Sequence, residues 1–303
     1  TLALNSNYSL TYVADTFTIT PRAITVKADP KAKLFGEVDP SLTYQITAGT
    51  LIGSDTFSGS LVRVSGEAVG KYAINKGSLA LSDNYSLIYI RDSLTIGTTP
   101  IVVKADPQSK VYGNNDSLFT YHIVSGTVLA GDTFSGSLTR VAGENIGKYV
   151  IGQGSLSLPS GYVLTFIVDT QTITPRAITV KADPKAKLFG EVDPSLSYQI
   201  TVGTLIGSDT FSGSLVRVSG EAVGKYVINK GLLALSANYS LTYLRDSLTI
   251  GTTTIVVKAD PRSKVYGNDD STFTYHIVSG ALIGNDTFSG SLTRVAGENI
   301  GKY

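Results

Sequence analysis

The 303-residue sequence has no Cys, Met or Trp and only two His. Without Cys, neither a disulfide framework nor a thiolate zinc site can form. Charge is scarce and balanced, because 25 basic and 24 acidic side chains leave a net charge of +1. Such a chain has little long-range attraction for nucleic acid or for an anionic membrane. We therefore predict neither as a partner.

Long hydrophobic runs are missing too, although 42% of the residues are hydrophobic. This composition is rich enough for packed cores and unlike that of a disordered chain, but its apolar runs are too short to span a bilayer. We predict no membrane span. The sequence opens at Thr1 without the pattern of a signal peptide, and we expect it to be part of a longer polypeptide.

What the sequence does have is a repeat of 77 residues. Lys-Ala-Asp-Pro begins at Lys27, Lys104, Lys181 and Lys258, and Gly-Lys-Tyr ends at Tyr72, Tyr149, Tyr226 and Tyr303. The first and third repeats are nearly identical and are called A-type here; the second and fourth match each other and are called B-type. Divergence between direct neighbours lowers the risk that adjoining repeats misfold together.

The register of the repeat divides the chain into five segments. We assign residues 1–23 to the closing strands of a preceding B-type repeat, 24–100 and 178–254 to A-type repeats, 101–177 to a B-type repeat, and 255–303 to an incomplete B-type repeat. Each repeat runs almost directly into the next, so we predict no flexible linker. Direct junctions of this kind predict that the neighbouring repeats of the chain support one another in a rod.

Within a repeat, apolar and polar residues alternate with a period of two, which indicates strands. The alternation covers residues 24–28, 42–46 and 85–89, with further strands expected at 56–64, 71–75 and 93–96 and at most a short helix at 50–56. We predict an all-β chain of tandem small β-grasp-like domains in an elongated rod, with the first and last strands of each repeat parallel and adjacent. Immunoglobulin-like β-sandwich repeats are the alternative.

Several blocks of the second repeat resemble one known family. They are Ile-Val-Val-Lys-Ala-Asp-Pro from Ile101, Lys-Val-Tyr-Gly from Lys110, Phe-Thr-Tyr from Phe119, Gly-Asp-Thr-Phe-Ser-Gly-Ser-Leu-Thr-Arg from Gly131, and Ala-Gly-Glu-Asn-Ile-Gly-Lys-Tyr from Ala142. The sequence resembles the MBG domain of the YGX type. Its signature stands at Tyr112-Gly113-Asn114 and Tyr266-Gly267-Asn268, whereas A-type repeats have Phe35-Gly36-Glu37 and Phe189-Gly190-Glu191. The resemblance implies a tandem module of large bacterial surface and secreted adhesins, related to the β-grasp, with no catalytic residues.

The residues that could carry catalysis have simpler roles. His122 and His276 alternate with inward-facing residues, so we expect both to point to solvent. The recurring carboxylates, which are Asp29, Asp39, Asp55 and Glu67 in the first repeat, are expected to cap turns by binding nearby backbone N–H groups. Most Tyr residues, including Tyr44, Tyr85 and Tyr89, lie on apolar registers and are expected in the core. We predict no enzyme, no catalytic site and no cofactor.

Two devices could stabilise so small a repeat besides contact with its neighbours. Calcium could bind Asn114-Asn115-Asp116 or Asn268-Asp269-Asp270, although the spacing matches no known calcium loop. An isopeptide bond could join Lys27 to Asn84, but the B-type repeat has Gly161 in the register of Asn84. We predict no metal site.

Three functional hypotheses follow from these features. The first is a structural stalk or fibre segment of an extracellular bacterial adhesin, a rigid spacer without chemistry of its own. The second is a module that binds host or surface glycans such as mucin. In the third, residues 1–23 of one copy complete the last repeat of another by strand addition, giving a concentration-dependent head-to-tail filament whose length would collapse when residues 1–21 are deleted.

Overall fold

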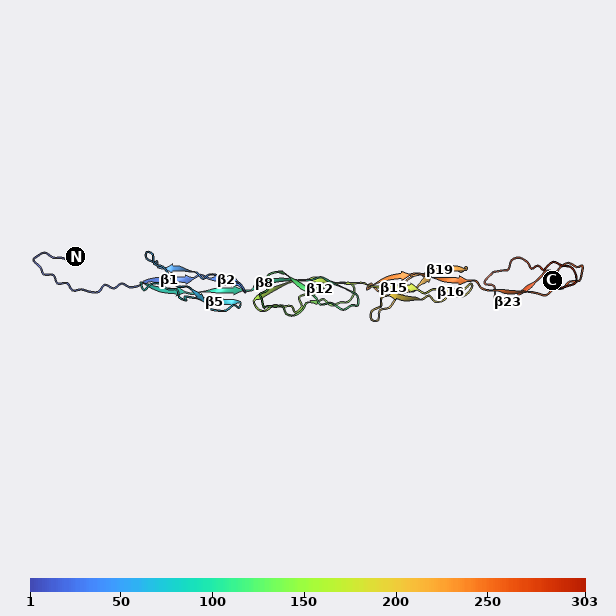
Figure 1. The fold of residues 1–303 in the computed structure, drawn as a ribbon, viewed down its shortest axis with the longest axis horizontal. Coiled ribbons are helices and arrows are strands. Elements are labelled where there is room, and N and C mark those ends of the chain that lie inside the picture. Colours follow the sequence, from blue (N-terminus) through green and yellow to red (C-terminus); the bar gives the residue numbers. More distant parts are fainter. The chain divides into compact units, whose positions relative to one another are not determined.

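The computed structural model describes residues 1–303, and every regular element in it is a β-strand (Figure 1). The all-β prediction is confirmed. The short helix allowed at residues 50–56 is absent: that segment makes a turn in which the Asp55 N–H donates to the Ile52 carbonyl, next to Gly53 with φ of 59°. No helix in the chain is long and apolar enough to cross a membrane.

The strands follow the same order in each of the first three repeats. The first repeat contains β1 (Arg22–Ala28), β2 (Lys31–Leu34), β3 (Tyr44–Ala48), β4 (Val62–Arg63), β5 (Gly70–Asn75), β6 (Tyr85–Ile90) and β7 (Asp92–Gly97). The second contains β8 (Thr99–Ala105), β9 (Gln108–Val111), β10 (Tyr121–Ser125), β11 (Thr139–Arg140), β12 (Gly147–Gly152), β13 (Tyr162–Ile167) and β14 (Asp169–Thr174). The third contains β15 (Arg176–Ala182), β16 (Lys185–Leu188), β17 (Tyr198–Val202), β18 (Val216–Arg217), β19 (Gly224–Asn229), β20 (Tyr239–Leu244) and β21 (Asp246–Gly251), and the last contains β22 (Val256–Ala259) and β23 (Tyr275–Ser279).

Each A-type repeat consists of two small sheets, and each sheet contains one parallel pair of strands. In the first repeat the sheets have the orders β3-β1-β6 and β2-β7-β5-β4. The opening strand β1 pairs parallel with β6, and β2 pairs parallel with β7. Asp29-Pro30 interrupts the opening strand because Pro has no N–H for the ladder. The predicted parallel neighbourhood of first and last strands is confirmed.

The core of a repeat lies under its opening strand. Ile24 and Val26 are 0% exposed, and Leu79 and Tyr85 join them in one cluster. Tyr44 and Tyr89 pack against this cluster, as predicted from their apolar registers. Burying one such aliphatic side chain contributes about 1.5–3 kcal/mol, so a small repeat depends strongly on each of them.

By its contacts the chain divides into two compact units. One consists of Thr1–Gln108, Ser117–Ala142 and Tyr149–Gln171; the other consists of Ser109–Asp116, Gly143–Lys148 and Thr172–Tyr303. The division passes through the second repeat instead of between repeats. Two segments of the second repeat, Ser109–Asp116 and Gly143–Lys148, therefore belong with the third repeat.

The last repeat shows what the closing strands contribute. In the second repeat β13 pairs parallel with the opening strand β8, and Val103 of β8 is 0% exposed. In the last repeat only β22 and β23 form, and Val257, in the register of Val103, is 43% exposed. Residues 1–21 form no strand, so their assignment as closing strands of a preceding repeat stays a prediction.

Candidate functional site: the repeat junctions and the charged cluster

The junctions between repeats are the first place where side chains of distant sequence meet. β7 ends at Gly97 and β8 begins at Thr99, so one residue separates them. β14 likewise ends at Thr174 and β15 begins at Arg176. A connection this short keeps successive repeats in contact.

At the first junction, the family signature of one repeat packs against the next repeat. The Phe35 ring meets the Tyr162 ring edge-on, with centroids 5.4 Å apart. Gly36, with φ of 84°, gives space to Leu129, because a Cβ at Gly36 would lie 2.5 Å from its Cδ1. The Thr99 hydroxyl donates to the Phe35 carbonyl at 2.6 Å. This contact is mainly apolar.

At the second junction, the corresponding ring carries a hydroxyl group. Tyr112 meets Tyr239 edge-on at 5.4 Å. The two hydroxyls donate to the same Asp209 carboxylate oxygen, Tyr112 at 2.9 Å and Tyr239 at 2.6 Å. The hydrogen bond to Asp209 and burial raise the pKa of Tyr112, because its ionised form would face a carboxylate.

Further polar contacts surround Tyr112 at this second junction. The side-chain oxygen of Asn238 accepts a hydrogen bond from the Ile146 N–H at 2.9 Å. The side-chain nitrogen of Asn238 donates to the side-chain oxygen of Asn145, also at 2.9 Å. The Arg176 guanidinium donates to the Tyr112 carbonyl at 2.8 Å and to the Asn114 side chain at 2.6 Å. The two junctions therefore have different chemistry at equivalent positions.

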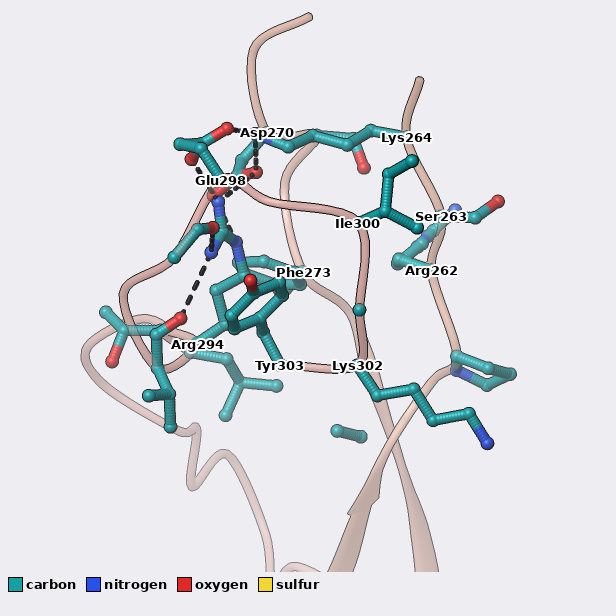
Figure 2. Close-up of a pocket in the computed structure, with 18 of the residues that line it drawn as sticks. Arg262, Ser263, Lys264, Asp270, Phe273, Arg294, Glu298, Ile300, Lys302 and Tyr303 are labelled. Carbon is teal, nitrogen blue, oxygen red and sulfur yellow. Dashed lines mark hydrogen bonds and ion pairs between the residues drawn. The ribbon is translucent and has the colours of Figure 1, made fainter. Parts of the chain in front are cut away.

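A charged cluster of two cations and two carboxylates lies next to the signature residues Phe35-Gly36-Glu37 of the first repeat. The Lys33 ammonium is 2.6 Å from Asp39 and 2.5 Å from Glu67, and its side chain is only 4% exposed. The Arg63 guanidinium pairs with the same two carboxylates and lies over the Tyr72 ring, 5.4 Å from its centroid. Formal charges in the cluster sum to zero. Figure 2 shows the counterpart in the last repeat, where Arg294 reaches Asp270 and Glu298 beside Tyr303.

We expect the cluster to make folding sensitive to acid. Hydrogen bonds from Arg63 and then Lys33 lower the pKa of Asp39 from 3.8 to about 2. A carboxyl with a depressed pKa stabilises the fold above its unfolded pKa, and this contribution is lost as protons bind. Stability should therefore fall as the pH drops from 3.8 towards about 2. Urea unfolding followed across this range should show a smaller fall in the Asp39→Asn variant; an equal fall would contradict the prediction.

The predicted roles of the recurring carboxylates need correction. Their hydrogen-bond partners are side chains instead of the backbone N–H groups of nearby turns. Asp29 accepts from the Thr43 hydroxyl at 2.5 Å, and Asp55 accepts from the Tyr85 hydroxyl at 2.6 Å. Asp39 and Glu67 meet, but Lys33 and Arg63 neutralise them, which does not favour proton transfer.

The two His are exposed as predicted, yet each has a carboxylate partner. His122 Nδ1 lies 2.6 Å from Asp106, and His276 Nδ1 lies 2.6 Å from Asp260. Hydrogen bonds from Thr120 and then His122 lower the pKa of Asp106. The Asp106 carboxylate lies between the Thr120 hydroxyl and the His122 imidazole. His122 therefore cannot act as the base for the Thr120 hydroxyl.

The geometry fits neither the isopeptide bond nor the calcium site that were considered from the sequence. Strand register places Lys27 opposite Ile90, whereas the Asn84 carbonyl binds the Arg22 N–H at the far end of β1. Five residues of strand, roughly 16 Å, separate Lys27 from Asn84, so the isopeptide hypothesis is wrong. In the Asn-Asn-Asp segment, Asn114 binds Arg176 and Asp116 pairs with Lys110. No group of three or more His, Asp or Glu is placed to hold a metal ion.

A cavity of about 900 Å³ lies in the last repeat, between residues 259–264 and 292–303 (Figure 2). In the first repeat the counterparts of its two walls include β2 and the start of β5, and β7 pairs with both of these strands there. The cavity therefore lies in the position of a closing strand, and we do not interpret it as a ligand site. The predicted head-to-tail association through residues 1–23 stays a prediction.

Together, these observations define an array of small all-β repeats joined by direct junctions, each repeat with its own charged cluster. The chain belongs to the MBG domain (YGX type) family, whose model matches residues 24–95, 101–172, 178–249 and 255–303. The resemblance seen in the sequence is thereby confirmed, and the family is one of non-catalytic repeat domains.

Comparison with individual proteins adds little. A search of curated proteins found no match. Among solved structures, the crystal structure of Down Syndrome Cell Adhesion Molecule (DSCAM) isoform 1.30.30, N-terminal eight Ig domains, is 12% identical, with a TM-score of 0.17. The alignment covers 86% of this chain and 45% of that chain, so this chain spans less than half the length of the molecule it matches.

Proposed function

We propose that the repeats form a structural stalk, a spacer that holds other parts of a bacterial surface or secreted adhesin away from the cell. The observation that carries this proposal is the direct junction. One residue connects β7 to β8, while the rings of Phe35 and Tyr162 pack across the connection. A connection without slack, reinforced by contacts on both sides, resists bending between repeats. The adhesin context and the extracellular location are what the MBG resemblance implies.

The spacer role requires no chemistry, and the side chains of the repeats support that view. Between residues 22 and 254, every Tyr and Phe side chain is buried or half-buried. Sugar recognition commonly uses exposed aromatic rings, so nothing in this region favours the glycan-binding alternative. Lys33 and Arg63 neutralise the two carboxylates that approach each other, and we propose that the repeats have no catalytic activity.

We expect the protein to scatter X-rays as a stiff rod with a largest dimension of roughly 150 Å. A ten-residue Gly/Ser insertion between Thr98 and Thr99 should allow bending and broaden the distance distribution. The matched control carries the same insertion between Gly53 and Ser54, in an exposed turn, and should keep the profile of the parent protein. A parent that already scatters as a flexible chain, or an insertion at Thr98 without effect, would refute the spacer proposal.

A further inference from the structure

The first two junctions differ at three positions of the end that one repeat presents and at one position of the face that receives it. The A-type end presents Phe35, Ala68 and Val69; the B-type end presents Tyr112, Asn145 and Ile146. On the receiving side, the A-type face has Asn84 or Asn238, and the B-type face has Gly161. The chain alternates A and B, so an A-type end always meets a B-type face.

Hydrogen bonds fit the B-type end to the A-type face. Asn238 binds both the Asn145 side chain and the Ile146 N–H, and the Tyr112 hydroxyl reaches Asp209. An A-type end at this face would offer Ala in place of Asn145 and Phe in place of Tyr112. The Asn238 amide and Asp209 would each lose a partner that the B-type end supplies, and a half-buried polar group that loses its partner destabilises the contact.

Close packing fits the A-type end to the B-type face. Gly161 has φ of 118°, a conformation suited to Gly, and its carbonyl accepts from the Thr99 N–H at 2.8 Å. The Phe35 ring lies directly over it, because a Cβ at Gly161 would be 2.7 Å from the ring. An Asn here would collide with Phe35 unless the backbone moved, and Ala68 could not bind its amide.

We propose that these junction residues encode the order of the repeats: the signature region of each repeat is a docking element that accepts only a neighbour of the other type. The family signature thereby acquires a physical role in fitting one repeat to the next. Specificity arises both from bonds gained in the matched pair and from bonds or space lost in the mismatched pair. The inference stands whether or not the chain serves as a stalk.

The first test removes the Asn of one A-type face. Asn238→Gly should raise the hydrogen-exchange rate of the Ile146 amide roughly tenfold in the protein of residues 1–303. Asn84→Gly is the matched control, because Asn84 occupies the same position in the other A-type repeat but is exposed, whereas Asn238 is half-buried and binds residues of the second repeat. The control should leave the Ile146 and Val69 amides unchanged. Equal effects of the two substitutions, or no effect of Asn238→Gly, would overturn the proposal.

The second test asks whether the match itself matters. Gly161→Asn alone should raise exchange of the Thr99 amide several-fold, because the A-type end cannot accept Asn. Adding Phe35→Tyr, Ala68→Asn and Val69→Ile gives the first repeat a B-type end and should restore protection. Gly161→Ala should resist this rescue, because Ala offers no amide to bind. If the B-type end fails to rescue Gly161→Asn, or rescues both variants equally, the order is not encoded here.

Discussion

Replacing Arg63 by Ala should lower the free energy of unfolding of the first repeat by about 2–3 kcal/mol. The Arg63 side chain is 11% exposed, pairs with Asp39 and Glu67, and donates to the carbonyls of Val64 and Gly66. Its removal leaves two carboxylates to be balanced by Lys33 alone, and five acceptor oxygens on four residues lose a charged donor. Urea unfolding of the full chain measures the loss.

Two further variants separate geometry from charge in this experiment. Arg63→Lys keeps the charge but not the planar fork that binds Asp39 through two nitrogens, so we expect an intermediate loss. Lys27→Ala removes a half-exposed ion pair in which the nitrogen is 3.7 Å from Asp92, and should cost less than about 1 kcal/mol. If Lys27→Ala proves as damaging as Arg63→Ala, the cluster has no special role in stability.

A larger loss, about 3–4 kcal/mol, is expected for Ile24→Ala. Ile24 is 0% exposed in the core cluster of the first repeat, so truncation removes buried apolar surface and leaves a cavity. Ile255→Ala is the matched control, because Ile255 has the same register in the last repeat but is only half-buried. Differential scanning calorimetry should show a clear fall in the midpoint temperature of the main unfolding transition for Ile24→Ala and little change for Ile255→Ala. Equal changes would contradict the core assigned here.

Much of the fold could be predicted from the two-residue alternation of apolar and polar side chains and from the turn residues between strands. The alternation around Ile24, Val26 and Tyr85 identified the strands of the core, and the alternation at residues 42–46 identified β3. The alternation failed to predict burial at one position of β3. Ile46 is 42% exposed although its register is apolar, and its partner Val26 lies next to the point where the β1–β3 ladder shifts. The short strand β2 was not predicted, because the residue that it buries is Lys33, a residue type that an apolar pattern does not place in a core.

The charged cluster and the junctions were harder to foresee. Lys33 and Glu67 are 34 positions apart, and no local pattern shows that they meet. One signal was available: Lys, Asp, Arg and Glu recur at these positions in all four repeats, whereas neighbouring surface residues differ between types. The role of the signature turn could not be found in one repeat, because the partners of Phe35 belong to the next one.

The parallel pairing of entry and exit strands also determines how a repeat bears tension. The chain enters at Arg22 and leaves after Gly97, at opposite ends of a pair that joins six positions of β1 to β6 and four of β2 to β7. A pull on both ends slides these strands past each other, so the hydrogen bonds along the pair share the load instead of opening one after another. The rate of forced unfolding then depends on breaking the whole ladder at once. We therefore expect a repeat of this design to resist stretching along its length.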